Sequence, residues 1–83
     1  MPVYVDDLNH YSGKGWWCHM AVETDGDLQE LHAFAKKIGL KRAWFQEHIR
    51  IPHYDLVRSK RSLALEWGAI AVSNKEMFRK CAR

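Results

Sequence analysis

The 83-residue sequence is poor in cysteine and has no long apolar run. Its two cysteines, Cys18 and Cys81, lie far apart and form no C-x-x-C pair, so we expect reduced thiols, as in a cytosolic protein. The N-terminal stretch MPVYVDDLNH has no cationic region followed by a long apolar segment, which indicates that it is not a signal peptide. No apolar run approaches the roughly 20 residues of a membrane span. These absences predict a cytoplasmic protein that does not bind a membrane.

Motifs of well-known enzymes are also missing. The sequence has no G-x-G-x-x-G, no Walker loop, no H-E-x-x-H and no G-x-S-x-G. Asp6, His19, His53 and Asp55 carry the oxygen and nitrogen atoms that metal ions use, but nothing in their spacing demands a shared site. We therefore expect no bound metal and no cofactor. The sequence leaves open whether the protein is an enzyme.

The composition is that of an ordinary globular protein with a weak positive charge. Hydrophobic residues make up 47% of the chain and include four tryptophans, so residues 1–83 are expected to form a single α/β domain. Thirteen lysines and arginines against ten acidic residues give a net charge of +3, and no basic run exceeds SKR. This pattern favours a small anionic partner over a nucleic-acid groove.

Three helices are predicted from caps and periodicity. The first is DLQELHAFAKKIGL, in which Asp27 and Glu30 have the capping-box spacing and Gly39 provides a left-handed stop. Its apolar side chains recur on one helix face. The second helix runs from about Arg58 to Trp67, and the third is NKEMFRKC, capped by Asn74.

Short apolar runs between these helices predict three strands, at Val3–Val5, Ala43–Phe45 and Ala69–Ser73. Residues 9–26 and the stretch QEHIRIPHYD are interpreted as loops, although Trp16–Val22 has the character of an additional edge strand. Strands that alternate with helices indicate right-handed crossovers. We therefore predict a small, three-stranded, mainly parallel sheet with flanking helices, similar to half of a Rossmann fold.

Polar side chains gather where this topology would place a ligand. In open parallel sheets, ligands bind at the carboxyl ends of the strands, where the following helices also begin. A helix start with free N–H groups and added cations suits an anion. The residues expected to bind it are His53, Tyr54, Asp55, Ser59, Lys60, Arg61, Gln46, Trp17 and His19. The alternative is a solvated helix start that Asp55 or Ser59 merely caps.

Trp16 and Trp17 are adjacent, so in an extended segment they point to opposite faces and cannot both enter one core. At least one of them is expected to contact a partner subunit or to stack on a ligand such as a nucleotide base. A short chain with a small sheet also has edges to cover, and we therefore expect a homo-oligomer.

Several short segments, taken in order, carry a resemblance to a known family. They are VYVDD, CHM, ELHAFAKKIGL, WFQ, PHYDL, SKR and GAIAVS. Over nearly the whole chain the sequence resembles the small proteins grouped as domain of unknown function 4031. The resemblance implies a phage or prophage setting, and hence the cytoplasm of a host cell, but it brings no established activity.

Three functions fit these observations. The first is the binding of a phosphorylated small ligand, with a nucleotide as the leading candidate, which in a phage would sequester a signal of host defence. The second is a phosphodiesterase-like hydrolase in which Asp6 is a base or metal ligand and His53 a general acid or base. The third is a module that binds a host protein or nucleic acid through tryptophans and the basic helix face.

Overall fold

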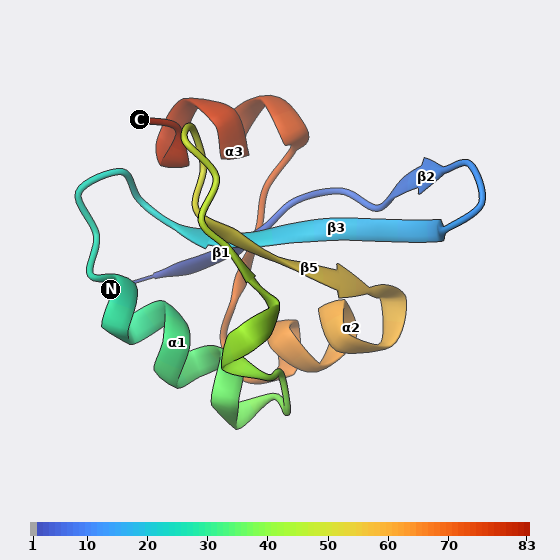
Figure 1. Ribbon diagram of the computed structural model, residues 1–83, viewed down its shortest axis with the longest axis horizontal. Coiled ribbons are helices and arrows are strands. Elements are labelled where there is room, and N and C mark those ends of the chain that lie inside the picture. Colours follow the sequence, from blue (N-terminus) through green and yellow to red (C-terminus); the bar gives the residue numbers. More distant parts are fainter. Residues whose placement is uncertain (1) are drawn as a thin grey trace.

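The computed structural model describes residues 2–83 and combines three α-helices with a six-stranded mixed sheet (Figure 1). The helices are α1 (Leu28–Lys37), α2 (Arg58–Glu66) and α3 (Asn74–Cys81), with a short 3-10 helix at Arg42–Trp44. The strands are β1 (Val3–Val5), β2 (Asn9–Tyr11), β3 (Gly15–Val22), β4 (Phe45–Gln46), β5 (His53–Val57) and β6 (Ile70–Ala71).

The long strand β3 lies at the centre of the sheet. The strand order is β4-β5-β3-β1-β6, and β2 pairs with β3 as a hairpin. β3 runs antiparallel to β1, β2 and β5, and only the pairing of β1 with β6 is parallel among the described residues. The sheet is therefore mixed and mostly antiparallel.

The α/β class is confirmed, but the three-stranded, mainly parallel sheet is wrong. Residues interpreted as loops form β2, most of β3 and the start of β5, and β3 is a central strand and not an edge strand. In the segments WCHM and HYDL, polar or aromatic residues that are partly exposed alternate with buried residues, because one face of the sheet is open to solvent there. These segments were interpreted as loops because each carries polar residues on one face.

The predicted strand at Val3–Val5 is confirmed, and the other two are shifted or shorter. Ala43 and Trp44 belong to the 3-10 helix, and only Phe45 continues into β4. The last strand is confined to Ile70–Ala71.

Helix starts follow the predicted chemistry at α1 but not at α2. Asp27 accepts a hydrogen bond from the Gln29 N–H at 2.8 Å, and Gly39 ends the helix with φ of +84°. Within residues 2–83, no side chain caps α2, so neither Asp55 nor Ser59 has the predicted capping role. At α3 the cap is Ser73, which accepts from the Glu76 N–H at 3.1 Å, one residue before the expected Asn74.

The two faces of the sheet are covered unequally. α1 and α2 pack on one face, which they cover with a core that includes Val5, Met20, Leu31 and Leu56 (Figure 1). α3 packs on the other face over a smaller cluster formed by Tyr4, Ala21, Met77 and Cys81. Part of this second face, beside the β2–β3 hairpin, therefore has no helix over it. No helix among residues 2–83 is long and apolar enough to span a membrane.

Candidate functional site

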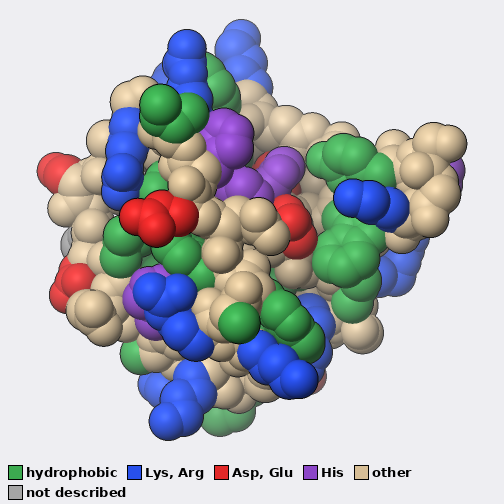
Figure 2. Space-filling view, in the orientation of Figure 1, with side chains coloured by type: hydrophobic (Ala, Val, Ile, Leu, Met, Phe, Trp, Pro, Cys, Tyr) green, Lys and Arg blue, Asp and Glu red, His purple; other side chains and the backbone are tan. Residues whose placement is uncertain are grey.

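Strand alternation places four polar or aromatic side chains on the open part of the sheet. Trp17 and His19 in β3 share this face with His53 and Asp55 in β5, and His19 is paired with Asp55 in the register. In Figure 2, histidine side chains gather in a hollow between α3 and the hairpin. The cluster lies on the face of the sheet and not at the carboxyl edge where we had expected it.

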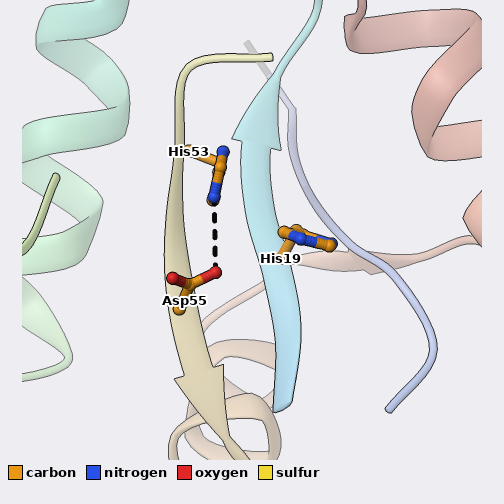
Figure 3. Close-up of side chains that lie close together, drawn as sticks. All are labelled: His19, His53 and Asp55. Atoms are coloured by element: carbon orange, nitrogen blue, oxygen red, sulfur yellow. Dashed lines mark ion pairs between the residues drawn. The ribbon is translucent and has the colours of Figure 1, made fainter. Parts of the chain in front are cut away.

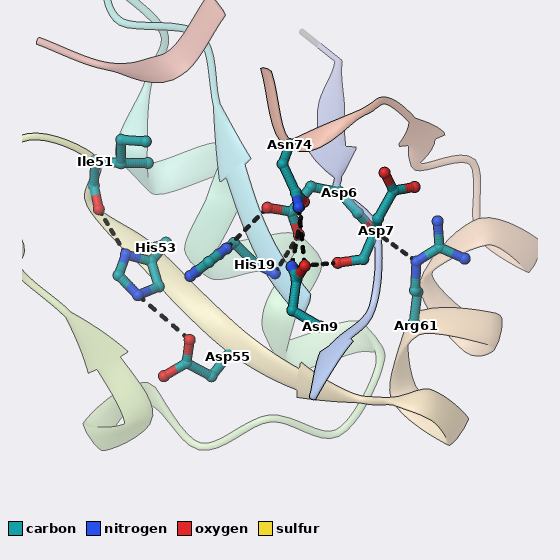
Figure 4. A network of polar contacts seen from close by, with 9 residues as sticks. All are labelled: Asp6, Asp7, Asn9, His19, Ile51, His53, Asp55, Arg61 and Asn74. Carbon is teal, nitrogen blue, oxygen red and sulfur yellow. Dashed lines mark hydrogen bonds and ion pairs between the residues drawn. The ribbon is translucent and has the colours of Figure 1, made fainter. Parts of the chain in front are cut away.

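Asp6, directly after β1, fixes the position of His19 through hydrogen bonds. The carboxylate is buried and accepts hydrogen bonds from the His19 backbone N–H at 2.6 Å and from its ring Nδ1 at 2.8 Å (Figure 4). The hydrogen bond that His19 donates to Asp6 raises the pKa of His19, and burial opposes this effect. Arg61 supports the same corner, because its Nε donates to the Asp6 carbonyl at 2.8 Å.

His53 is oriented by the loop that precedes it. Its Nδ1 lies 2.6 Å from the Ile51 carbonyl oxygen, and its Nε2 lies 3.3 Å from Asp55 Oδ1 (Figures 3 and 4). The interaction with His53 lowers the pKa of Asp55, whose side chain is 41% exposed. The rings of His19 and His53 meet edge to face with centroids 4.8 Å apart. Two imidazoles and a carboxylate thus face one hollow.

The hollow around these groups, which we call the histidine cleft, has a volume of about 320 Å³. It is lined by Tyr11, Lys14, Trp17, His19, His53 and Asp55. Towards α3 it continues into a second space whose lining includes Asn9, His48, Arg50, Asn74 and Phe78. The lining therefore offers cations, imidazoles and aromatic rings to a polar ligand.

A neighbouring groove of about 480 Å³ is more apolar. We call it the tryptophan groove, and its lining residues are Trp17, Leu40, Ala43, Trp44, Gln46, Asp55, Val57 and Lys60. It shares Trp17 and Asp55 with the histidine cleft. The two spaces therefore adjoin each other.

The structure brings together some of the expected site residues and separates others. Asp6, Trp17, His19, His53 and Asp55 belong to the cleft or support it, and Gln46 and Lys60 line the tryptophan groove.

Tyr54, Ser59 and Arg61 lie elsewhere. Tyr54 is buried on the opposite face, where its hydroxyl meets His32 Nδ1 at 2.8 Å. Ser59 is exposed on the first turn of α2. Lys60 lines the tryptophan groove, but its Nζ donates a hydrogen bond to the Ile38 carbonyl at 2.8 Å. Arg61 donates in the same way to the Asp6 carbonyl at 2.8 Å. The start of α2 is thus tied to α1 and β1 by its cations.

Several lining residues had no signal in the sequence. Lys14 and Tyr11 belong to the hairpin, Trp44 to the 3-10 helix, and His48 and Arg50 to an irregular loop. The one usable signal was the H-x-D spacing at residues 53–55, because residues two apart in a strand share a face.

Fold and cleft together define a small mixed α/β protein with a histidine and carboxylate site on an open sheet face. The model of the family described as protein of unknown function DUF4031 matches residues 3–83, and the chain belongs to this family. Comparison with curated proteins finds no match, and neither does comparison with solved structures.

Proposed function

We propose that the protein binds a phosphorylated small ligand, with a nucleotide as the leading class, across the histidine cleft and the tryptophan groove. The observation that carries this proposal is the continuity of the two spaces through Trp17 and Asp55. An aromatic groove next to a polar cleft matches a molecule with a flat ring at one end and a charged group at the other.

The base would occupy the tryptophan groove. Trp44 is 48% exposed and lines this groove together with Trp17, so both rings are available for stacking. Stacking of a base on an aromatic side chain contributes roughly 1–3 kcal/mol. Asp55, at the junction of the two spaces, would accept hydrogen bonds from ribose hydroxyl groups.

The phosphate would lie in the histidine cleft. Lys14 lines this cleft, and Arg50 lines the adjoining space towards α3. His19 adds positive charge when protonated, which its raised pKa favours. In a phage or prophage setting, such a binder would remove a signalling nucleotide of host defence from solution.

Calorimetric titration with mono-, di- and cyclic nucleotides, and with inorganic phosphate as a ligand control, tests the proposal. We expect Trp44→Ala and Lys14→Ala each to weaken nucleotide binding by about 1–3 kcal/mol. Trp67→Ala is the matched control, because Trp67 is 57% exposed at the end of α2 and outside both spaces. Equal losses for Trp44→Ala and Trp67→Ala would contradict the assignment, and so would binding of no nucleotide by the parent.

The hydrolase alternative is distinguished from simple binding by measuring whether the bound nucleotide is converted to product. The two neighbouring imidazoles of the cleft favour this alternative, but both carboxylate oxygens of Asp6 are engaged by His19. In this function Asp6 would position His19, and His53 would be the general acid or base. Chromatography would then show turnover that falls roughly a hundredfold in His53→Ala while binding persists.

The interaction-module alternative and the expected homo-oligomer rest on apolar side chains at the surface. Trp16, Trp67 and Ile70 are each about half exposed, and β6 is an edge strand of the sheet. Light scattering at high micromolar concentration tests self-association, and a strictly monomeric protein would contradict it. The salt dependence of any DNA or RNA binding tests the nucleic-acid alternative.

A further inference from the structure

We infer that His19, His53 and Asp55 form a binding site for a divalent transition-metal ion of the zinc class. Their potential ligand atoms all lie within 4.8 Å of one another, although the sequence spacing had given no reason to expect a metal. The inference rests on the geometry of these three side chains and does not depend on the phosphorylated ligand proposed above.

The proton on each imidazole can be assigned from its partner. A carbonyl oxygen only accepts hydrogen bonds, so His53 Nδ1, 2.6 Å from the Ile51 carbonyl, must carry a proton. The Asp6 carboxylate likewise accepts from His19 Nδ1 at 2.8 Å. In the neutral form of both rings the lone pair is therefore on Nε2.

The free nitrogen of His53 faces the Asp55 carboxylate. His53 Nε2 lies 3.3 Å from Asp55 Oδ1 (Figure 3), and a ring nitrogen of His19 lies within 4.8 Å of both groups. A lone pair facing a carboxylate at this distance is repulsive unless a proton or a metal ion lies between them. A tetrahedral zinc ion with bonds of about 2.1 Å separates its ligand atoms by roughly 3.4 Å, close to this spacing.

The surroundings are those of metal-binding histidines. Such histidines usually donate the other ring N–H to a carboxylate or to a backbone carbonyl, which fixes the ring and increases its basicity. His19 has the first kind of partner and His53 the second. Asp6 would thus be a positioning residue for the site and not a ligand.

The donor set selects the class of ion. Two imidazole nitrogens and one carboxylate suit zinc and its first-row neighbours, whereas magnesium and calcium prefer oxygen ligands. Three protein ligands leave at least one position for water or for an oxygen of a bound molecule. That position would face the histidine cleft, which Lys14 and Trp17 also line.

His48 provides an internal control, because it shares the neighbourhood but has the opposite proton assignment. Its ring centroid is 6.0 Å from that of His53, and its Nδ1 accepts from the backbone N–H groups of Arg50 and Ile51 at 3.1 and 3.4 Å. In the neutral ring the proton is therefore on Nε2, which cannot bind a metal. His48→Asn keeps an acceptor for the loop and removes only the imidazole.

The test is titration of chelator-treated protein with Co²⁺, followed by visible absorption, and with Zn²⁺, followed by calorimetry. We expect one ion per chain with roughly micromolar or tighter affinity. Loss of a residue that hydrogen-bonds a metal ligand typically weakens metal binding roughly 10- to 100-fold. His53→Ala and Asp55→Asn each remove a ligand itself, so they should weaken binding at least as much. His48→Asn should bind as the parent does.

Asp55→Asn keeps the experiment informative if a histidine variant fails to fold, because this side chain is partly exposed and the substitution preserves its shape. Circular dichroism confirms the fold of each variant. The site is refuted if the parent binds no stoichiometric ion, if Asp55→Asn binds it as tightly as the parent, or if His48→Asn loses as much affinity as Asp55→Asn.

Discussion

An Asp6→Asn substitution removes one negative charge from beneath His19 and changes almost nothing in side-chain shape. The Asp6 carboxylate accepts from the His19 backbone N–H at 2.6 Å and from ring Nδ1 at 2.8 Å. Asparagine keeps an oxygen for the backbone N–H, but its NH₂ group then faces Nδ1 and must donate to it. In the neutral ring the proton therefore moves to Nε2, the nitrogen that points into the histidine cleft.

The magnitude follows from which bonds survive this change. Hydrogen bonds to charged groups contribute about 1.5–3 kcal/mol, against about 1 kcal/mol for neutral pairs. We therefore expect the free energy of unfolding of the metal-free protein to fall by about 1–2 kcal/mol. The affinity for Co²⁺ should fall roughly 10- to 100-fold, as for other lost outer partners, because Nε2 then carries a proton.

Long-range ¹H–¹⁵N NMR reads the tautomer of His19 directly. The spectra should be recorded over a pH series carried upward until the ring signals no longer change, because the hydrogen bond to Asp6 raises the pKa of His19. The parent should show a protonated Nδ1 and the variant a protonated Nε2. Asp7→Asn is the matched control, because Asp7 is exposed and its substitution removes the same charge one residue away. If Nδ1 remains protonated in Asp6→Asn, or if Asp7→Asn changes the tautomer equally, the reasoning is refuted.

Three further predictions concern stability and reactivity. Lys60→Met keeps the aliphatic stem but removes the hydrogen bond to the Ile38 carbonyl at the end of α1. The free energy of unfolding measured in urea should therefore fall by about 1–2 kcal/mol. An unchanged free energy would mean that water replaces this bond. Burial lowers the pKa of His32 in the folded protein. The stability that the uncharged ring contributes is therefore fully present above about pH 6.5, the ordinary pKa of histidine. It is lost as the pH falls through the lower pKa of His32 in the folded protein. His32→Gln, which can still bond Tyr54, should therefore lose less stability than the parent between pH 7.5 and 5, and parallel curves would contradict this. Burial raises the pKa of Cys18 to about 12 and that of Cys81 to about 11, so both thiols should react with a disulfide reagent at pH 8 only after unfolding.

The helices could be predicted because their signals are local. Asp27 and Gly39 mark the two ends of α1 within one stretch of sequence, and the apolar stripe between them needs no distant partner. The strands could not be predicted in the same way. In β5, His53 and Asp55 alternate with buried residues, but a five-residue alternation after a proline looks the same as a polar loop until β3 is known to lie beside it.

The candidate site was predicted in its residue types more than in its location. His19, His53 and Asp55 were all singled out, yet only the antiparallel pairing of β3 with β5 brings them together. Lys60 and Arg61 show the reverse case. Adjacent cations at a helix start suggest an anion, whereas the fold engages both with main-chain carbonyl groups of distant segments. Only the tertiary structure determines which main-chain carbonyl groups lie within reach of Lys60 and Arg61.

The central position of β3 has a consequence for experiments on the intact chain. His19 lies between β1, which leads to Asp6, and β5, which carries His53 and Asp55, so opening either pairing takes the cleft apart. The unfolded chain therefore has no binding site, and any ligand of the cleft stabilises the folded protein against unfolding. At a concentration a hundred times its dissociation constant, a ligand adds about 2.7 kcal/mol to native stability. Melting curves measured across a library of metals and nucleotides would therefore rank candidates without an assay for activity.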